Sequence, residues 1–135
     1  MNSRDIVNLL MGIPFLSGGR DRNGADCFGL LLMFAKENEI ELPDVEYSEN
    51  WVERGGNLLI ENAHKYADEI ERDELSVGDV IFFQNDPRAV NHVGIFLGED
   101  RFVHTTEIHG SIVQRLSSQP YCRRVHSFYR LKPSQ

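Results

Sequence analysis

The sequence has little cysteine: Cys27 and Cys122 are the two in 135 residues, and they lie in unlike contexts. This excludes a disulfide-stapled scaffold and fits synthesis in a reducing compartment. Basic residues are also few, 14 against 21 acidic ones, and the net charge of −7 argues against a nucleic-acid partner, which would need a basic face. No apolar run approaches a membrane span, and residues 1–6 lack the apolar core of a signal peptide. We therefore predict neither a nucleic-acid partner nor a membrane partner.

The chain has an ordinary soluble composition, 41% hydrophobic and 26% charged, and is long enough for one domain over residues 1–135. Apolar residues at helical spacing predict helices from an N-cap at Ser3 to Met11, from Cys27 to about Glu39, and over about 57–70. Residues 44–56 look irregular, with Trp51 as an anchor on the core. The pattern then changes to strands at 80–83, 92–97, 101–105, 112–116 and 123–131. Helices followed by a run of antiparallel strands predict an α+β domain with a meandering sheet or small barrel.

Cys27 opens the second predicted helix, directly after Asp26 as N-cap. The positive end of a helix dipole stabilises a thiolate, so this position predicts a lowered pKa and a nucleophilic thiol. The backbone N–H of Cys27 is a natural donor to the oxyanion of a tetrahedral intermediate. On its own, a cysteine is more often a small buried hydrophobe.

His92 and His104 lie on two predicted strands joined by a turn at 98–100, so they are expected on paired strands where facing side chains meet. With Cys27 they predict a nucleophile, a base (His92) and an orienting residue (His104). Gly94 shares a face with His92 and leaves room beside the imidazole. Alone, His92 would more often be a structural histidine, and His104 could equally be a satisfied core residue under Phe102. A Cys-His-His zinc site is the chemical alternative, but it lacks a close-spaced ligand pair, so neither a metal nor another cofactor is predicted.

The chain resembles the NlpC-type cell-wall cysteine peptidases, which have a papain-like α+β fold. The resemblance rests on four motifs in order, over about Pro14 to His104: Gly18-Gly19, Asp26-Cys27-x-Gly29-Leu30, Gly78 to Phe83, and His92 to Gly98 running into Phe102-Val103-His104. It implies that Cys27 is the nucleophile, His92 the base and His104 the orienting residue. It also implies a peptidoglycan stem peptide as substrate, often cut between D-γ-glutamate and a diamino acid.

Two positions depart from that pattern: Phe28 follows the cysteine where many relatives have serine, and Phe15 precedes the glycine pair where many have tyrosine. Both phenylalanines, with Gly19 as a cleft wall, are predicted to border the substrate. Asp26 is predicted to bind a substrate ammonium if its carboxylate is not used up as the helix cap.

The stretches Gly19 to Leu30 and Glu39 to Asp44 are similar to the phage branch of the family. That resemblance implies a tail-associated or prophage-encoded peptidase, made in the bacterial cytoplasm without a signal peptide, with phage tail proteins as partners. Two other functions stay open. One is a structural tail-assembly module with a vestigial site, and the other is a cytoplasmic thiol amidase or acyltransferase, since papain-like cores support several acyl transfers.

Overall fold

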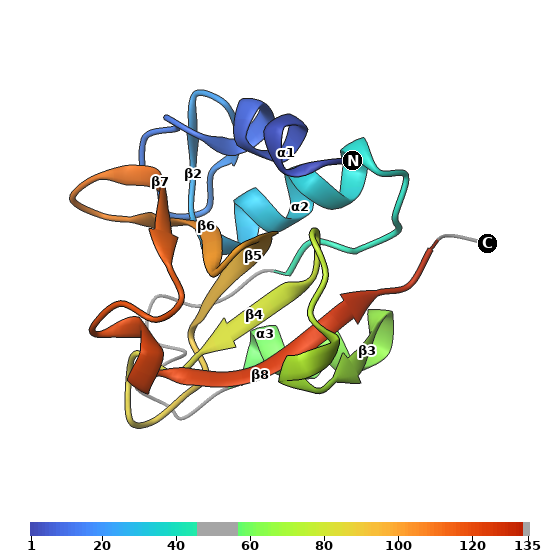
Figure 1. The fold of residues 1–135 in the computed structure, drawn as a ribbon. Helices are drawn as coiled ribbons and strands as arrows, with labels where there is room; N and C mark the ends of the chain where they lie inside the picture. The colour runs from blue at the N-terminus through green and yellow to red at the C-terminus, as the bar shows by residue number, and fades with distance from the viewer. Residues whose placement is uncertain (46–56, 134–135) are drawn as a thin grey trace.

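The computed structural model describes residues 1–45 and 57–133. In this part of the chain helices come first and a sheet follows, so the predicted α+β class is confirmed (Figure 1). The helices are α1 (Ser3–Leu10), α2 (Cys27–Glu37) and α3 (Leu58–Tyr66), with 3₁₀ turns at Arg72–Glu74 and Tyr121–Arg123. The predicted anchoring by Trp51 lies outside the described residues.

The main sheet is antiparallel and has the strand order β3-β8-β4-β5-β6-β7. From β4 to β7 each strand pairs with the next, as predicted, whereas β8 returns to lie between β3 and β4 (Figure 1). The meander places the two histidine strands, β5 and β6, side by side. The strands are β3 (Ala67–Ile70), β4 (Val80–Phe83), β5 (His92–Gly98), β6 (Arg101–Thr106), β7 (Gly110–Arg115) and β8 (Val125–Leu131).

Two predicted helix boundaries are wrong. The N-cap of α1 is Asn2 rather than Ser3, because the Asn2 side chain accepts from the backbone N–H of Asp5 at 2.9 Å and completes a capping box. The third helix ends at Tyr66 rather than Ile70, because residues 67–70 pair with β8 as an edge strand. Both boundaries depend on contacts that helical periodicity does not report.

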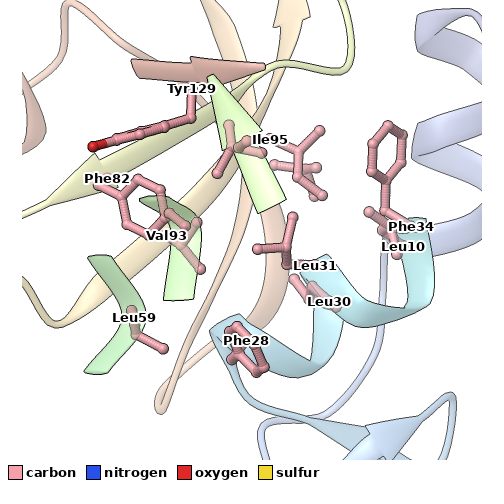
Figure 2. Close-up of a cluster of buried hydrophobic side chains, with 14 of the residues drawn as sticks. Leu10, Phe28, Leu30, Leu31, Phe34, Leu59, Phe82, Val93, Ile95 and Tyr129 are labelled. Carbon is pink, nitrogen blue, oxygen red and sulfur yellow. The ribbon is translucent and has the colours of Figure 1, made fainter. Parts of the chain in front are cut away.

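The main core lies between the helices and one face of the sheet. Strand alternation turns Val80 and Phe82 of β4 toward this core, while Ile81 and Phe83 belong to a second cluster. Figure 2 shows side chains from all three helices and from β4, β5 and β8 gathered in the main core: Leu10, Phe28, Leu30, Leu31, Phe34, Leu59, Phe82, Val93, Ile95 and Tyr129. Packing of side chains along the whole of α2 therefore fixes the position of its first residues.

A small hairpin, β1 (Arg20–Asp21) with β2 (Gly24–Ala25), fastens the glycine-rich loop against the first turn of α2. A Cβ atom on Gly29 would lie 2.2 Å from the backbone oxygen of Gly19, and one on Gly19 would lie 2.2 Å from the backbone oxygen of Gly24. Only glycine permits these approaches. The loop and the helix start thus form one rigid support for Cys27.

Candidate active site

Cys27 is the first residue of α2, where backbone N–H groups of the first turn have no partner within the helix. Asp26 caps this turn, as predicted: its Oδ1 accepts from the backbone N–H of Gly29 at 2.8 Å. The thiol is partly buried and is not in a disulfide. The geometry therefore presents a free thiol at the N-terminal end of a helix.

The carboxylate of Asp26 is fully engaged and only 6% of the residue is exposed. Besides the cap, Oδ1 accepts from Arg20 Nη1 at 2.8 Å, and Oδ2 accepts from the backbone N–H of Gly18 at 2.8 Å. The sequence predicted an ammonium contact only for a carboxylate left over from capping. These bonds make Asp26 part of the support of the site. Asp26 also lines the cleft beside Cys27, so its contact with a substrate ammonium stays a prediction.

The two candidate histidines contact each other directly. Nε2 of His92 lies 2.7 Å from Nδ1 of His104, and the ring planes are nearly perpendicular at 79°. His104 is completely buried, while His92 is 8% exposed. A base with a small accessible surface and a buried partner behind it is the arrangement expected of a base and its orienting residue.

A glutamine that the sequence did not single out extends this pair. Oε1 of Gln114, on β7, lies 2.6 Å from Nε2 of His104. The three residues occupy three neighbouring strands, because β6 pairs with both β5 and β7. Alternation along β7 could not have placed Gln114 on the face of His104, because that placement depends on the register between β6 and β7, which pairs Gln114 with Phe102 and is visible only in the fold.

Aromatic rings enclose the histidines. Phe102 and Tyr121 lie 4.7 Å from the His104 ring, centroid to centroid, and Phe83 lies 5.6 Å from the His92 ring. Gly94 makes room in this cluster, although for a different ring than predicted: a Cβ there would lie 2.8 Å from Cδ2 of Phe102. The cluster fixes both imidazoles in an environment with little water.

Burial decides the protonation of the resting site. It lowers the pKa of His92 from 6.5 to about 3, with the neighbouring His104 adding to the effect. It also lowers the pKa of His104, against the hydrogen bond to Gln114, which raises it. For Cys27, burial first and the negative charge of Asp26 second raise the pKa to about 12, although backbone N–H groups such as that of Val93 oppose the rise. The predicted lowering of the thiol pKa is therefore wrong, because desolvation outweighs the helix end. At neutral pH the site rests as a thiol and two neutral imidazoles.

These histidines make stability depend on pH. His92 becomes protonated near pH 6.5 in the unfolded chain but only near pH 3 in the folded chain. Between these two pH values the unfolded state therefore binds more protons than the folded state. We expect the free energy of unfolding to fall by about 2 kcal/mol between about pH 6.5 and about pH 4.5. Urea unfolding across this range measures it. His92→Phe should flatten the dependence and His109→Gln, an exposed control, should not; equal slopes in all three proteins would contradict the assignment.

A cleft of about 380 Å³ opens at Cys27 and His92, and both residues line it. The predicted border residues Phe15 and Phe28 line it too, whereas Gly19 is not in the lining and acts through its backbone approach to the helix. Phe28 is only 2% exposed and belongs to the main core, so it packs as well as borders the cleft. Contact of these residues with a substrate stays a prediction. The cleft also holds polar side chains that the sequence did not single out: Ser17, Asn85, Asn91, Thr105, Thr106 and Glu107.

Within residues 1–45 and 57–133, no three His, Cys, Asp or Glu side chains are grouped closely enough to hold a metal ion. None of the helices in these ranges combines the length and apolarity of a membrane-crossing segment.

The fold and the site define a papain-like α+β domain with a cysteine at a helix start and a histidine pair on the adjoining sheet. Residues 12–130 match the profile of the NlpC/P60 family, and the chain belongs to that family. Among solved structures, it is similar to an NlpC/P60 family protein from Bacillus cereus, with a TM-score of 0.75 and 20% identity over 98% of this chain and 41% of the other. It is also similar in fold to RipD from Mycobacterium tuberculosis, described as a non-catalytic NlpC/p60 domain protein, with a TM-score of 0.58 and 16% identity, covering 96% of this chain and 95% of the other.

Relatives in sequence carry related names. A protein of Haemophilus influenzae named "Probable endopeptidase" is 30% identical over 82% of this chain and 60% of its own length. The Escherichia coli "Murein DD-endopeptidase MepS/Murein LD-carboxypeptidase" is 27% identical over 84% of this chain and 52% of its own length. The "Tail tip assembly protein K" of phage lambda is 26% identical over 94% and 64%. The chain thus spans between 52% and 64% of the length of these relatives.

Proposed function

We propose that this chain is a cysteine endopeptidase that hydrolyses amide bonds in peptidoglycan stem peptides. The observation that carries the proposal is the hydrogen bond between His92 and His104 beside a cleft that Cys27 also lines. Family membership and the murein-cleaving relatives support the choice of substrate. A member described as non-catalytic, RipD, shows that the fold alone does not imply activity.

The resting protonation suggests how the reaction begins. With Nε2 of His92 turned to His104, Nδ1 is the ring nitrogen left to accept the proton of Cys27. Because thiol and imidazole both rest neutral, the proton moves as the sulfur attacks the amide carbon, in general-base fashion. In this proposal the backbone N–H of Cys27 donates to the resulting oxyanion.

The rest of the cycle follows from the same groups. The tetrahedral intermediate collapses to a thioester, and the imidazolium of His92 gives its proton to the leaving amine. His92 then takes a proton from the water molecule that attacks the thioester. As the second tetrahedral intermediate collapses to the carboxylic acid, the imidazolium returns its proton to the sulfur and restores the thiol. No group outside the protein, the peptide and water is needed.

The test is digestion of purified peptidoglycan, with mass spectrometry of the released fragments. We expect wild type and a Cys122→Ala control to release the same peptide fragments and Cys27→Ala to release none. Each cut should add one water across an amide bond, which separates hydrolysis from acyl transfer to an amine. Equal release by wild type and Cys27→Ala, or none by wild type on walls of several compositions, would overturn the proposal.

We further propose that the peptidase acts as part of a phage tail, with tail proteins as partners. The similarity to the lambda tail tip protein over 94% of this chain supports this location. Mass spectrometry of purified phage particles tests it: the chain should copurify with tails, and its absence from intact particles that carry the gene would contradict the location without touching the chemistry.

A further inference from the structure

Gln114 ends a line of hydrogen bonds that begins at the candidate base. Nε2 of His92 lies 2.7 Å from Nδ1 of His104, whose Nε2 lies 2.6 Å from Oε1 of Gln114. Both distances are short for hydrogen bonds with an N–H donor, whose usual lengths are about 2.7 to 3.2 Å. In the sheet Gln114 pairs with Phe102, two residues before His104, so its side chain crosses diagonally to the imidazole on the same face.

The chemistry of the amide oxygen sets the direction of every proton in this line. A carbonyl oxygen only accepts, so Nε2 of His104 must carry a hydrogen and donate it to Gln114. A neutral imidazole carries one N–H, so Nδ1 of His104 is then an acceptor. Nε2 of His92 must therefore be the donor to it, and Nδ1 of His92 keeps its lone pair.

We propose that Gln114 is a positioning residue that holds both histidines in the Nε2–H tautomer and so leaves Nδ1 of His92 free to accept the proton of Cys27. The hydrogen-bond geometry stands on its own, whereas the catalytic consequence of this role rests on the proposed peptidase function. With the opposite tautomers, Nδ1 of His92 would carry a hydrogen and could not accept the thiol proton.

A neutral acceptor suits this place. His104 is fully buried, and Phe102 and Tyr121 pack against its ring. A carboxylate would also accept from Nε2, but its charge would draw a second proton onto the pair. An amide fixes the tautomer while leaving both rings neutral.

Three substitutions distinguish a side chain that accepts the hydrogen bond of His104 from one that only fills the same space. The fold should tolerate them, because Gln114 is only partly buried and lies near the end of β7. Gln114→Glu keeps an acceptor, Gln114→Met keeps the length without hydrogen bonding, and Gln114→Lys offers only donors. We expect kcat/KM to fall by about fivefold or less for Glu, about 30-fold for Met, and on the order of 10³-fold for Lys, approaching the loss seen when a serine protease base is held in the wrong tautomer. Gln84→Lys, at an exposed glutamine outside the cleft, is the control and should match wild type.

Two further measurements, the pH profile of activity and the nitrogen-15 shifts of the imidazoles, should not change if Gln114 has only a structural role. The acid limb of the pH profile should rise in Gln114→Glu, because the carboxylate increases the proton affinity of the histidines, while it stays in place for the Gln84 control. Nitrogen-15 shifts of the imidazoles report tautomers without any assay of activity. Wild type should show unprotonated Nδ1 in both rings, and Gln114→Lys should show the reverse.

The spectra keep this inference separate from the proposed function. Unprotonated Nδ1 in a wild type that cleaves no peptidoglycan would uphold the role of Gln114 and overturn only the substrate. A protonated Nδ1 on His92 in wild type, tautomers unchanged in folded Gln114→Lys, or equal losses in the Glu and Met variants would each overturn the role.

Discussion

Replacing His92 with alanine is expected to lower kcat/KM on a stem peptide by about 10³- to 10⁴-fold, because the proposed acceptor of the thiol proton is removed. His92 and Cys27 line the same cleft, and the backbone N–H of Val93, the next residue, lies against the thiol. The remaining rate comes from binding and the oxyanion donor. Steady-state kinetics on one synthetic peptide measures the loss.

The partner residue gives a graded version of this experiment. His104→Asn keeps an amide oxygen that can accept from Nε2 of His92, whereas His104→Ala keeps none. We expect the asparagine variant to lose about tenfold and the alanine variant about 10²-fold or more. Since His104 is completely buried, both variants need a matched unfolding curve. An unchanged rate in folded His104→Ala would contradict the orienting role, and an active His92→Ala would contradict the assignment of the base.

The parts of this site that local pattern controls could be predicted from the sequence. Asp26 before an apolar helix predicts the cap, and the cap places Cys27 at the first helical position. The turn at 98–100 predicts the β5–β6 hairpin, and there Gly98, Glu99 and Asp100 all have positive φ. These features depend on neighbours a few residues away, which is the range over which propensity and turn chemistry act.

The parts set by distant pairing could not be predicted. Residues 67–70 continue a helical pattern, but β8 provides hydrogen-bonding partners for them, from Ala67 with Leu131 to Ile70 with Phe128. The role of Gln114 depends in the same way on the register between β6 and β7. Sheet pairing overrides local preference because each paired residue gains backbone hydrogen bonds and cross-strand packing together.

The pKa of Cys27 is the sharpest difference between sequence and structure, since the helix end predicts a thiolate whereas burial and Asp26 favour the thiol. A helix dipole at a partly buried position is worth up to about 2 kcal/mol, and desolvation of a buried charge costs more. The tertiary environment thus keeps Cys27 protonated, whereas the local motif alone predicts a thiolate.

We therefore expect alkylation of Cys27 by iodoacetamide to rise about tenfold per pH unit from about pH 7 to about pH 9, without a plateau. Below its pKa of about 12 the thiolate fraction grows in proportion to hydroxide, and no preformed thiolate–imidazolium pair holds it constant. The measurement uses a Cys122→Ser background, so that one thiol reports, with the Cys27→Ser protein as the control for Cys122.

Asp26→Asn tests the second cause of the high pKa separately from burial. Asparagine is as good an N-cap as aspartate, so the first turn of α2 keeps its cap while the negative charge beside the thiol is removed. Alkylation of Cys27 at about pH 8 should then become several-fold faster, with an unfolding curve recorded beside it because the ion pair with Arg20 is lost. A pH-independent alkylation rate between about pH 6 and pH 8 in the Cys122→Ser protein would show a preformed thiolate–imidazolium pair. The resting thiol would then be wrong, and the thiolate that the helix end alone predicts would be correct.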